Sequence, residues 1–251
     1  MAILLDAPST SAVSTAFRIL ASMGTTAAPT ASGIAGSMEI GAAPDGSSAL
    51  QVTIRGTDPL TYGGQRSELL ADPEPTAIRW YAFDIWVPST FGADRISIMQ
   101  IHDTPDGGES PVKFPNFEFV VRESKSLEVY VPFDCPSEAT SNSRLVGACP
   151  LVTDRWVRCV LYCHWQSTTA AWFEAYHDGQ LVCSEWWRPF RYTDVTGPYL
   201  QIGLYDLFHT GFSGQRRAWY RNIRIGDSAE TYASMLGVAP SPRRLAQVPF
   251  F

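Results

Sequence analysis

The sequence predicts an all-β fold, a two-sheet sandwich of the jelly-roll type. Short runs of alternating apolar and polar residues recur along the chain, and residues that favour tight turns separate them. Aromatic residues are frequent, with 8 Trp, 10 Tyr and 13 Phe beside 19 Gly and 18 Pro, a mixture that suits short strands and tight turns. Hydrophobic residues make up 45% and charged residues 18%, so a large core is available and global disorder is excluded.

Alternating polarity predicts strands over most of the chain from residue 50 to residue 225. The predicted strands are 50–55, 77–87, 95–102, 116–122, 127–133, 156–166, 171–177, 199–205 and 217–225. Asp178-Gly179 lies between two strand-like runs, and this arrangement predicts a hairpin with a two-residue turn. A short helix is expected near 229–236.

The chain carries no clear linker, and 251 residues fit one large β domain. We expect that domain over 41–226, with 1–40 packed on it as an extension and 227–251 forming a short helix and an extended tail. Assembly through the termini, into a homo-oligomer or a particle, is one role for these segments. No run is apolar enough to cross a bilayer, and the start of the chain, with an early Asp6 and no basic region, does not predict a secretory signal.

Charge and cysteine content exclude several classes of function. The net charge of −6 disfavours nucleic acid, and an acidic glycan would need a local basic cleft. Nearly all basic residues are Arg, which a GC-rich genome explains for the bulk composition. Cys135 and Cys149 bracket a polar loop, and either a disulfide or free thiols would fit their spacing. No metal-binding pattern is present, so no cofactor is expected; Ca²⁺ would be compatible but is not indicated.

Polar side chains follow one face of three otherwise apolar segments, because residues two apart on a strand share a face. The rows are Arg66 with Glu68, Gln100 with His102, and Tyr199 with Gln201 and Tyr205 around Gly203. A lone His is usually a surface residue and a Tyr pair usually packs, but three chemically coherent rows favour a binding face. We expect Gly203 to leave space there for a ligand.

These rows resemble the motifs of the jelly-roll polysaccharide lyases, a concanavalin A-like group that includes alginate, glucuronan and heparin lyases. That group carries R-[ST]-E-L, Q-[IV]-H and Y-x-K-x-G-x-Y in this order. This chain has Arg66-Ser67-Glu68-Leu69, Gln100-Ile101-His102 and a third motif from Tyr199 to Tyr205, and the resemblance spans about 50–226. It implies a concave groove for an acidic polysaccharide. Gln201 stands where the group commonly has Lys.

The resemblance also implies β-elimination at a 4-linked uronate of a capsular or extracellular polymer. Neutralising the uronate carboxylate falls to Arg66 and Gln100, with Glu68 orienting Arg66. His102 is the expected base and Tyr205 the expected acid. The remaining substrate-binding candidates are Tyr199, Gln201, Lys113 and Arg122.

Other residues have weaker interpretations. His164 would border the cleft or lie on the surface, His177 would be solvated at a hairpin, and His209 would reach a subsite. Trp186 and Trp187 would stack on sugars or form buried edges of the sandwich.

Two other functions compete with the lyase. One is a non-catalytic, glycan-binding protein on a virus-like particle. Gln201 in place of a cation favours binding without catalysis. A protein that acts outside the cell without an evident secretory signal could leave it as part of a particle. The other is a hydrolase, which is disfavoured because the chain lacks an E-x-D-x-x-E pair of carboxylates.

Overall fold

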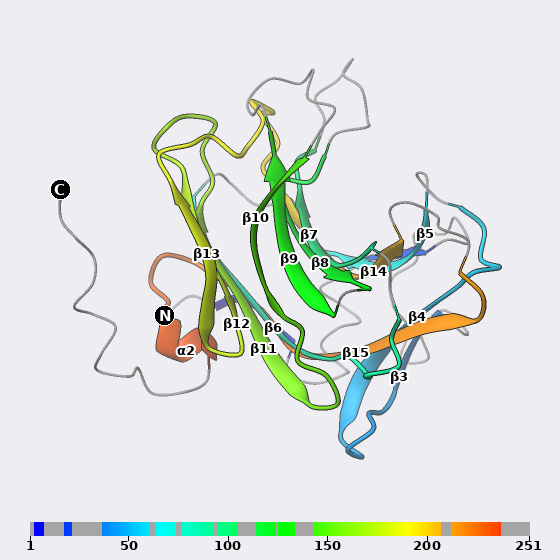
Figure 1. Ribbon diagram of the computed structural model, residues 1–251. Coiled ribbons are helices and arrows are strands. Elements are labelled where there is room, and N and C mark those ends of the chain that lie inside the picture. Colours follow the sequence, from blue (N-terminus) through cyan, green and yellow to red (C-terminus); the bar gives the residue numbers. More distant parts are fainter. Residues whose placement is uncertain are drawn as a thin grey trace.

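The structure is a computed structural model, and it describes the backbone of 3–7 and 18–21 and all atoms of most of the remainder. The fully described ranges are 37–60, 64–73, 77–92, 95–104, 114–123, 125–133, 143–206 and 212–236. Within these ranges two antiparallel sheets pack face to face, which confirms the predicted jelly roll (Figure 1). No helix in the described part of the chain is long and apolar enough to span a membrane.

One sheet, here called the front sheet, carries the predicted motifs. Among the described residues it has seven strands, in the order β10-β9-β8-β7-β14-β5-β2. Their bounds are β10 Ser143–Pro150, β9 Ser126–Pro132, β8 Phe117–Arg122, β7 Arg95–His102, β14 Tyr199–Asp206, β5 Gln65–Leu70 and β2 Arg18–Ala21. Figure 1 shows this sheet bending between β9 and β5, with the face turned away from the other sheet lying inside the bend.

The other sheet, here called the back sheet, has eight strands within the described ranges, in the order β13-β12-β11-β6-β15-β4-β3, with β1 paired to β15. Their bounds are β13 Gln180–Trp186, β12 Trp172–His177, β11 Trp156–His164, β6 Ile78–Trp86, β15 Gln215–Gly226, β4 Ser48–Arg55, β3 Met38–Ala42 and β1 Ile3–Ala7. The predicted strands are present within two residues at each end. β3 and β10 were not predicted, and β1 and β2 lie in the segment that was expected as an extension. β13 was expected only as the second arm of the hairpin, and β5 was found only through its motif.

The core lies between the sheets, where the apolar side of each strand is buried. On β8, for example, Phe117, Phe119 and Val121 are buried against the back sheet, and the ring of Phe119 lies 6.4 Å from that of Phe83 on β6. Tyr220 is also fully buried there, and its hydroxyl donates to the carbonyl oxygen of Gly203 at 2.8 Å. This hydrogen bond ties β15 of the back sheet to β14 of the front sheet.

The predicted hairpin joins β12 to β13. His177 pairs with Gln180, and the two residues between them have positive φ, 53° at Asp178 and 72° at Gly179. Two left-handed residues in a two-residue loop match the twist of the flanking strands, so the prediction is confirmed.

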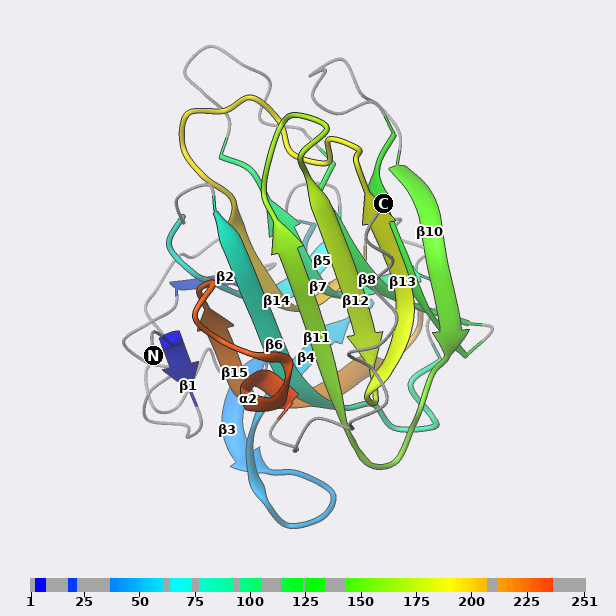
Figure 2. The same ribbon diagram turned by 90° about the vertical axis from the view of Figure 1, so that its left-hand side faces the viewer.

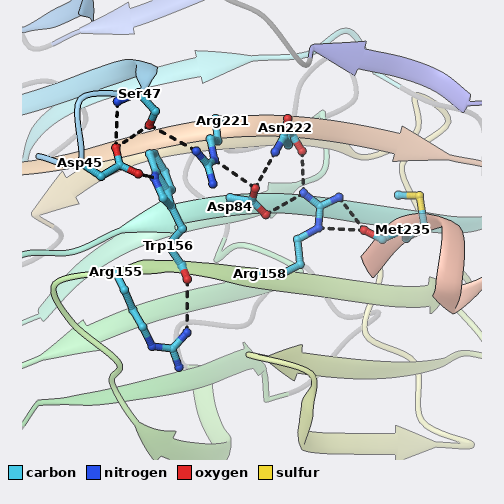
Figure 3. Close-up of polar contacts among 9 residues, drawn as sticks. All are labelled: Asp45, Ser47, Asp84, Arg155, Trp156, Arg158, Arg221, Asn222 and Met235. Atoms are coloured by element: carbon cyan, nitrogen blue, oxygen red, sulfur yellow. Dashed lines mark hydrogen bonds and ion pairs between the residues drawn. The ribbon is translucent and has the colours of Figure 1, made fainter. Parts of the chain in front are cut away.

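A short helix, α2 (Tyr232–Leu236), covers the outer face of the back sheet (Figure 2). It begins later than the predicted helix, and its Met235 is buried against Trp80 and Val160. Arg158 donates to the Met235 carbonyl at 2.8 Å through Nε and to Asp84 at 2.9 Å through Nη1 (Figure 3). Asp84 also accepts from Asn222 at 2.6 Å, so one buried carboxylate joins β6, β11 and β15 beneath the helix.

The described cysteines, Cys149, Cys159, Cys163 and Cys183, are free thiols. Cys135 lies outside the described residues. Of the two alternatives for Cys149, the structure therefore supports the free thiol.

Candidate active site

The three predicted rows lie side by side, because β5, β14 and β7 are neighbours in the front sheet. Residues directly opposite one another in antiparallel strands have Cβ atoms about 4.5–5.5 Å apart. The opposed pairs are Tyr199 with His102, Gln201 with Gln100, Tyr205 with Arg66, and Gly203 with Glu68. The register therefore gathers residues that are more than 130 positions apart in the chain onto the face inside the bend, here called the polar face.

Tyr205 and Arg66 form a stacked pair on the polar face. The Arg66 guanidinium carbon lies 3.7 Å from the centre of the Tyr205 ring, and Arg66 Nη1 is 3.5 Å from Glu68 Oε2. Burial raises the pKa of Tyr205, while the charge of Arg66 and a hydrogen bond from it act in the opposite direction. A phenol held protonated in this way is suited to donate a proton.

His102 lies at the end of β7 with its ring half-buried. Its Nδ1 is 2.9 Å from the carbonyl oxygen of Asp103. A carbonyl only accepts hydrogen bonds, so Nδ1 carries the hydrogen and the neutral ring keeps its lone pair on Nε2. The adjacent ring is that of Tyr199, 5.9 Å away between centres. His102 thus has the tautomer that a base acting through Nε2 requires.

Asp103 fixes the chain just beyond His102. Its carboxylate accepts from the backbone N–H of Tyr192 at 2.9 Å and lies 3.6 Å from Arg191 Nε. Burial raises the pKa of Asp103 to about 6, which hydrogen bonding from Asn116 and the charge of Arg191 partly oppose. The segment after β13 is thereby attached to the strand end that carries His102.

The two glutamines make different hydrogen bonds. Gln100 Nε2 donates to Glu118 Oε1 at 3.1 Å, and Gln201 Nε2 donates to the Tyr199 hydroxyl at 3.3 Å. Within the described part of the protein, Gln201 Oε1 is buried and has no hydrogen-bond partner. Gln201 therefore puts a neutral amide, with its carbonyl unpaired, beside Gln100.

Sequence reasoning missed Glu118 and Arg95, which share the polar face. Glu118 lies on β8 directly opposite Gln100. The sequence feature that could have identified it is a carboxylate between two core residues, Phe117 and Phe119. Arg95 could not be assigned to this face from the sequence, because a bulge in β7 between Ser97 and Met99 shifts the alternation of side chains between the two faces by one residue. The Arg95 guanidinium lies over the Tyr130 ring at 4.4 Å.

Glu68 and Glu118 form the buried acidic part of the polar face. Burial raises the pKa of each carboxyl group to about 7. The charge of Arg66 partly opposes this rise at Glu68, and the charge of Arg95 is the main opposing influence at Glu118. Both carboxyl groups have almost no exposed surface. The polar face therefore combines two cations with two acids that are readily protonated.

Gly203 has a different role from the one expected. A Cβ at this position would lie 2.2 Å from the Ser67 carbonyl oxygen and 2.7 Å from the Glu68 Cα, and the residue has φ of 149°. The glycine therefore allows the β5 backbone to approach β14. The expectation that it leaves space for a ligand is wrong.

The predicted substrate contact Arg122 lies away from these residues. Arg122 lies opposite Arg95, at the far end of β7 from His102, and is 3.6 Å from Glu128. Seven residues of strand separate Arg95 from His102, roughly 20 Å. Arg122 also lines a cavity of about 230 Å³ with Lys125 and Phe91, so this cavity is not the candidate active site. Lys113 lies outside the described residues.

The remaining histidines and tryptophans lie elsewhere. His164 is on β11 of the back sheet, as the surface alternative predicted. His177 is buried, 3.6 Å from Cys149 Sγ, and burial lowers its pKa to about 4, so the predicted solvated position is wrong. Trp186 and Trp187 are 42% and 72% exposed, which excludes buried edges. His209 lies outside the described residues.

No group of three or more His, Cys, Asp or Glu residues in the described ranges could hold a metal ion. The polar face offers an imidazole whose Nδ1 is directed at a backbone carbonyl, a buried phenol stacked on a guanidinium, and an amide donor.

Comparisons with known proteins place this geometry in a family. A family model described as polysaccharide lyase matches 41–224. A comparison with curated proteins finds no match.

Solved structures with the same fold are only distantly similar in sequence. An endo-β-1,4-glucuronan lyase from the fungus Trichoderma reesei is 21% identical with a TM-score of 0.65, over 80% of this chain and 90% of that one. An alginate lyase from Pseudomonas aeruginosa is 15% identical with a TM-score of 0.57, over 88% and 100%. The family 7 alginate lyase A1-II′ is 14% identical with a TM-score of 0.59, over 84% and 95%. The family model spans most of the chain and these structures share its fold, and the chain therefore belongs to the polysaccharide lyase family.

Proposed function

We propose that this lyase cleaves a 4-linked uronate polymer by β-elimination. The observation that carries the proposal is the register of β5, β14 and β7, which sets His102, Gln100 and Arg66 opposite Tyr199, Gln201 and Tyr205. The named activities of the structurally similar glucuronan and alginate lyases support a uronate as the substrate.

The reaction needs a base, an acid and a group that stabilises charge on the uronate carboxylate. His102 Nε2 removes the proton from C5, a double bond forms between C4 and C5, and the bond from C4 to the bridging O4 breaks. Tyr205 donates its phenolic proton to O4. The amide N–H of Gln100 faces the carboxylate as negative charge develops on it.

Arg66 supports Tyr205 in this scheme. Its guanidinium is stacked on the phenol and paired with Glu68, so its positive charge acts on the carboxylate and on the tyrosine from beneath the ring. Tyr199 and Gln201 would line the sugar site beside His102. Lys113 and Arg122 would contact sugars farther along the polymer.

An absorbance assay for unsaturated uronates on alginate, glucuronan and heparin-like polymers tests the proposal. Wild type should produce the absorbance on at least one polymer, and H102A and Y205F should lose at least about 100-fold in kcat. Y162F changes a tyrosine on β11 of the back sheet and is the matched control. Y199F tests the alternative acid, because Tyr199 lies directly opposite His102. Loss of turnover in Y199F but not in Y205F would reassign the acid to Tyr199, and full activity in both H102A and Y205F would refute the mechanism. Since side chains supply every step, we expect EDTA to leave the rate unchanged.

A glycan-binding protein without turnover is the second candidate, and the observation that favours it is the neutral Gln201. Binding of a uronate polymer with no unsaturated product from wild type would select this function. In either case we propose action outside the cell, on a capsular or extracellular polymer, with particle association as the route. Immunodetection of the protein in purified particles and in cell fractions tests the location.

A further inference from the structure

Glu118 is a buried acid that the mechanism above does not use. It lies on β8, with Gln100 directly opposite on β7 and Tyr130 directly opposite on β9. Its residue surface is 2% exposed. A carboxylate at such a place needs a reason, because burying a charge without partners is unfavourable.

The contact with Gln100 fixes the orientation of an amide. Gln100 Nε2 is 3.1 Å from Glu118 Oε1. Above its raised pKa of about 7, Glu118 is an ionised carboxylate, which only accepts hydrogen bonds. A flipped amide would set Gln100 Oε1 against Oε1 of Glu118, so that two acceptors would face each other. One N–H hydrogen of Gln100 is therefore used by Glu118, and the planar geometry directs the other away from it.

The surroundings hold Glu118 in place without competing for this contact. Arg95 on β7 and Arg66 on β5 face it as cations, and Glu68 on β5 is the nearby acid. The hydroxyl of Ser97 on β7 donates to the backbone carbonyls of Met99 and Phe119. Arg95 is itself stacked on Tyr130. The carboxylate thus lies in a fixed polar setting that spans three strands.

We propose that Glu118 is a positioning residue that holds Gln100 with an amide N–H directed at the uronate carboxylate of the substrate. This inference rests on the proposed function. A carboxylate substrate accepts and does not donate, so a Gln100 presented by its carbonyl would repel it. Glu118 excludes that orientation before the substrate arrives, which is the preorganisation that stabilises developing charge.

The test separates the hydrogen-bond acceptor from the charge. E118M has a side chain of similar length and no acceptor, whereas E118Q keeps a carbonyl acceptor for Gln100 and loses the charge. E118M should lower kcat by roughly 10- to 100-fold with KM changed by less than about threefold, because the lost stabilisation belongs to the transition state. E118Q should recover most of this loss. E123Q removes a charge from the exposed turn after β8 and is the matched control.

Melting temperatures distinguish positioning from folding. Removing one partner from a buried set of charges destabilises the fold, and E118M and E118Q both take the charge away from Arg95 and Arg66. The two variants should therefore lose similar stability, whereas only E118M should lose activity. If E118M fails to fold, E118L provides a second apolar variant. In a Q100A background E118M should have no further effect on kcat, because Glu118 acts through Gln100.

Three results would overturn the inference: E118M as active as wild type, E118Q as impaired as E118M, or an equal effect of E118M with and without Gln100. A wild type that binds the polymer but yields no unsaturated product would instead refute the proposed function. The two failures are therefore distinguishable.

Discussion

The free energy of unfolding should fall as the pH rises from 5 to 8, and E118Q should reduce that fall. Burial raises the pKa of Glu118 from 4.5 to about 7. Between these values the unfolded chain has lost the proton and the folded chain retains it. Because the folded state binds more protons in this range, stability decreases with rising pH until the folded carboxyl has ionised. The shift corresponds to about 3 kcal/mol, of which about 2 to 3 kcal/mol falls between pH 5 and pH 8.

Glu68, whose pKa is also raised to about 7, adds to the fall in stability of the wild type. Asp103 and His177 contribute to the wild-type curve as well. Asp103, whose pKa is raised to about 6, acts in the same direction as Glu118. His177, whose pKa is lowered to about 4, acts in the opposite direction, because the unfolded imidazole binds a proton below about pH 6.5. Asp103 and His177 titrate in E118Q as well, so subtracting the two curves removes their contributions and leaves that of Glu118 together with its effect on Glu68. Loss of the Glu118 charge also lowers the pKa of Glu68, which further flattens the E118Q curve.

Urea unfolding at pH 5, 6, 7 and 8, at constant ionic strength, measures the effect. E123Q removes a carboxylate that is exposed on the turn after β8, and its curve should remain parallel to that of wild type. A curve for E118Q that is also parallel to wild type would show that Glu118 ionises alike in the folded and unfolded chains, and the reasoning from burial would be refuted.

Three further substitutions test the packing and the site. G203A should lower the free energy of unfolding in urea by more than about 2 kcal/mol, because the new Cβ would lie 2.2 Å from the Ser67 carbonyl oxygen. G41A is the control and should be nearly neutral, because its Cβ would have nothing within 4 Å. Equal stability of the two variants would contradict the close approach of β5 to β14. D84A should cost about 1–3 kcal/mol, because it removes the carboxylate that Arg158 and the partly exposed Arg221 share. D178N, in the exposed pair with Arg155, should cost less than about 1 kcal/mol. Equal melting temperatures of the two variants would disprove the anchoring role of Asp84. Q201K should raise kcat by about tenfold, because it adds a cation beside Gln100. Q201M adds no charge and should not raise kcat. An unchanged or lower kcat in Q201K would contradict this expectation and indicate that Gln201 is adapted to this substrate.

The sequence predicted the polar face wherever simple alternation holds. The rows on β5 and β14 and the pair Gln100 with His102 could be read from residues two apart, and the hairpin at Asp178-Gly179 from turn chemistry. Register between distant strands is not written in any local pattern. The order of the motifs indicated one site, but only the pairing of β14 with both β5 and β7 brings them together.

What the sequence could not predict depends on irregular or tertiary features. The bulge in β7 changes which side Arg95 occupies, and no turn residue or glycine marks it. His177 was expected in solvent because it precedes the hairpin, yet its ring is covered by the neighbouring strand that carries Cys149. β10 and β13, at the edges of the sheets, have mixed burial and therefore lack clean alternation. Glu118 was overlooked because the other residues near it on β8 are apolar and predict a strand that is buried in the core.

The charge of the polar face links these features to the binding of an anionic polymer. The chain has a net charge of −6, so attraction must be local. At high pH, Glu68 and Glu118 offset Arg66 and Arg95, and the face is close to neutral. Below about pH 7 both acids hold protons, the two guanidinium groups are no longer offset, and affinity for a polyanion should rise. Binding of the polymer should therefore weaken as the pH rises through about 7, and E118Q, which lacks one of the two acids, should bind more tightly than wild type at high pH.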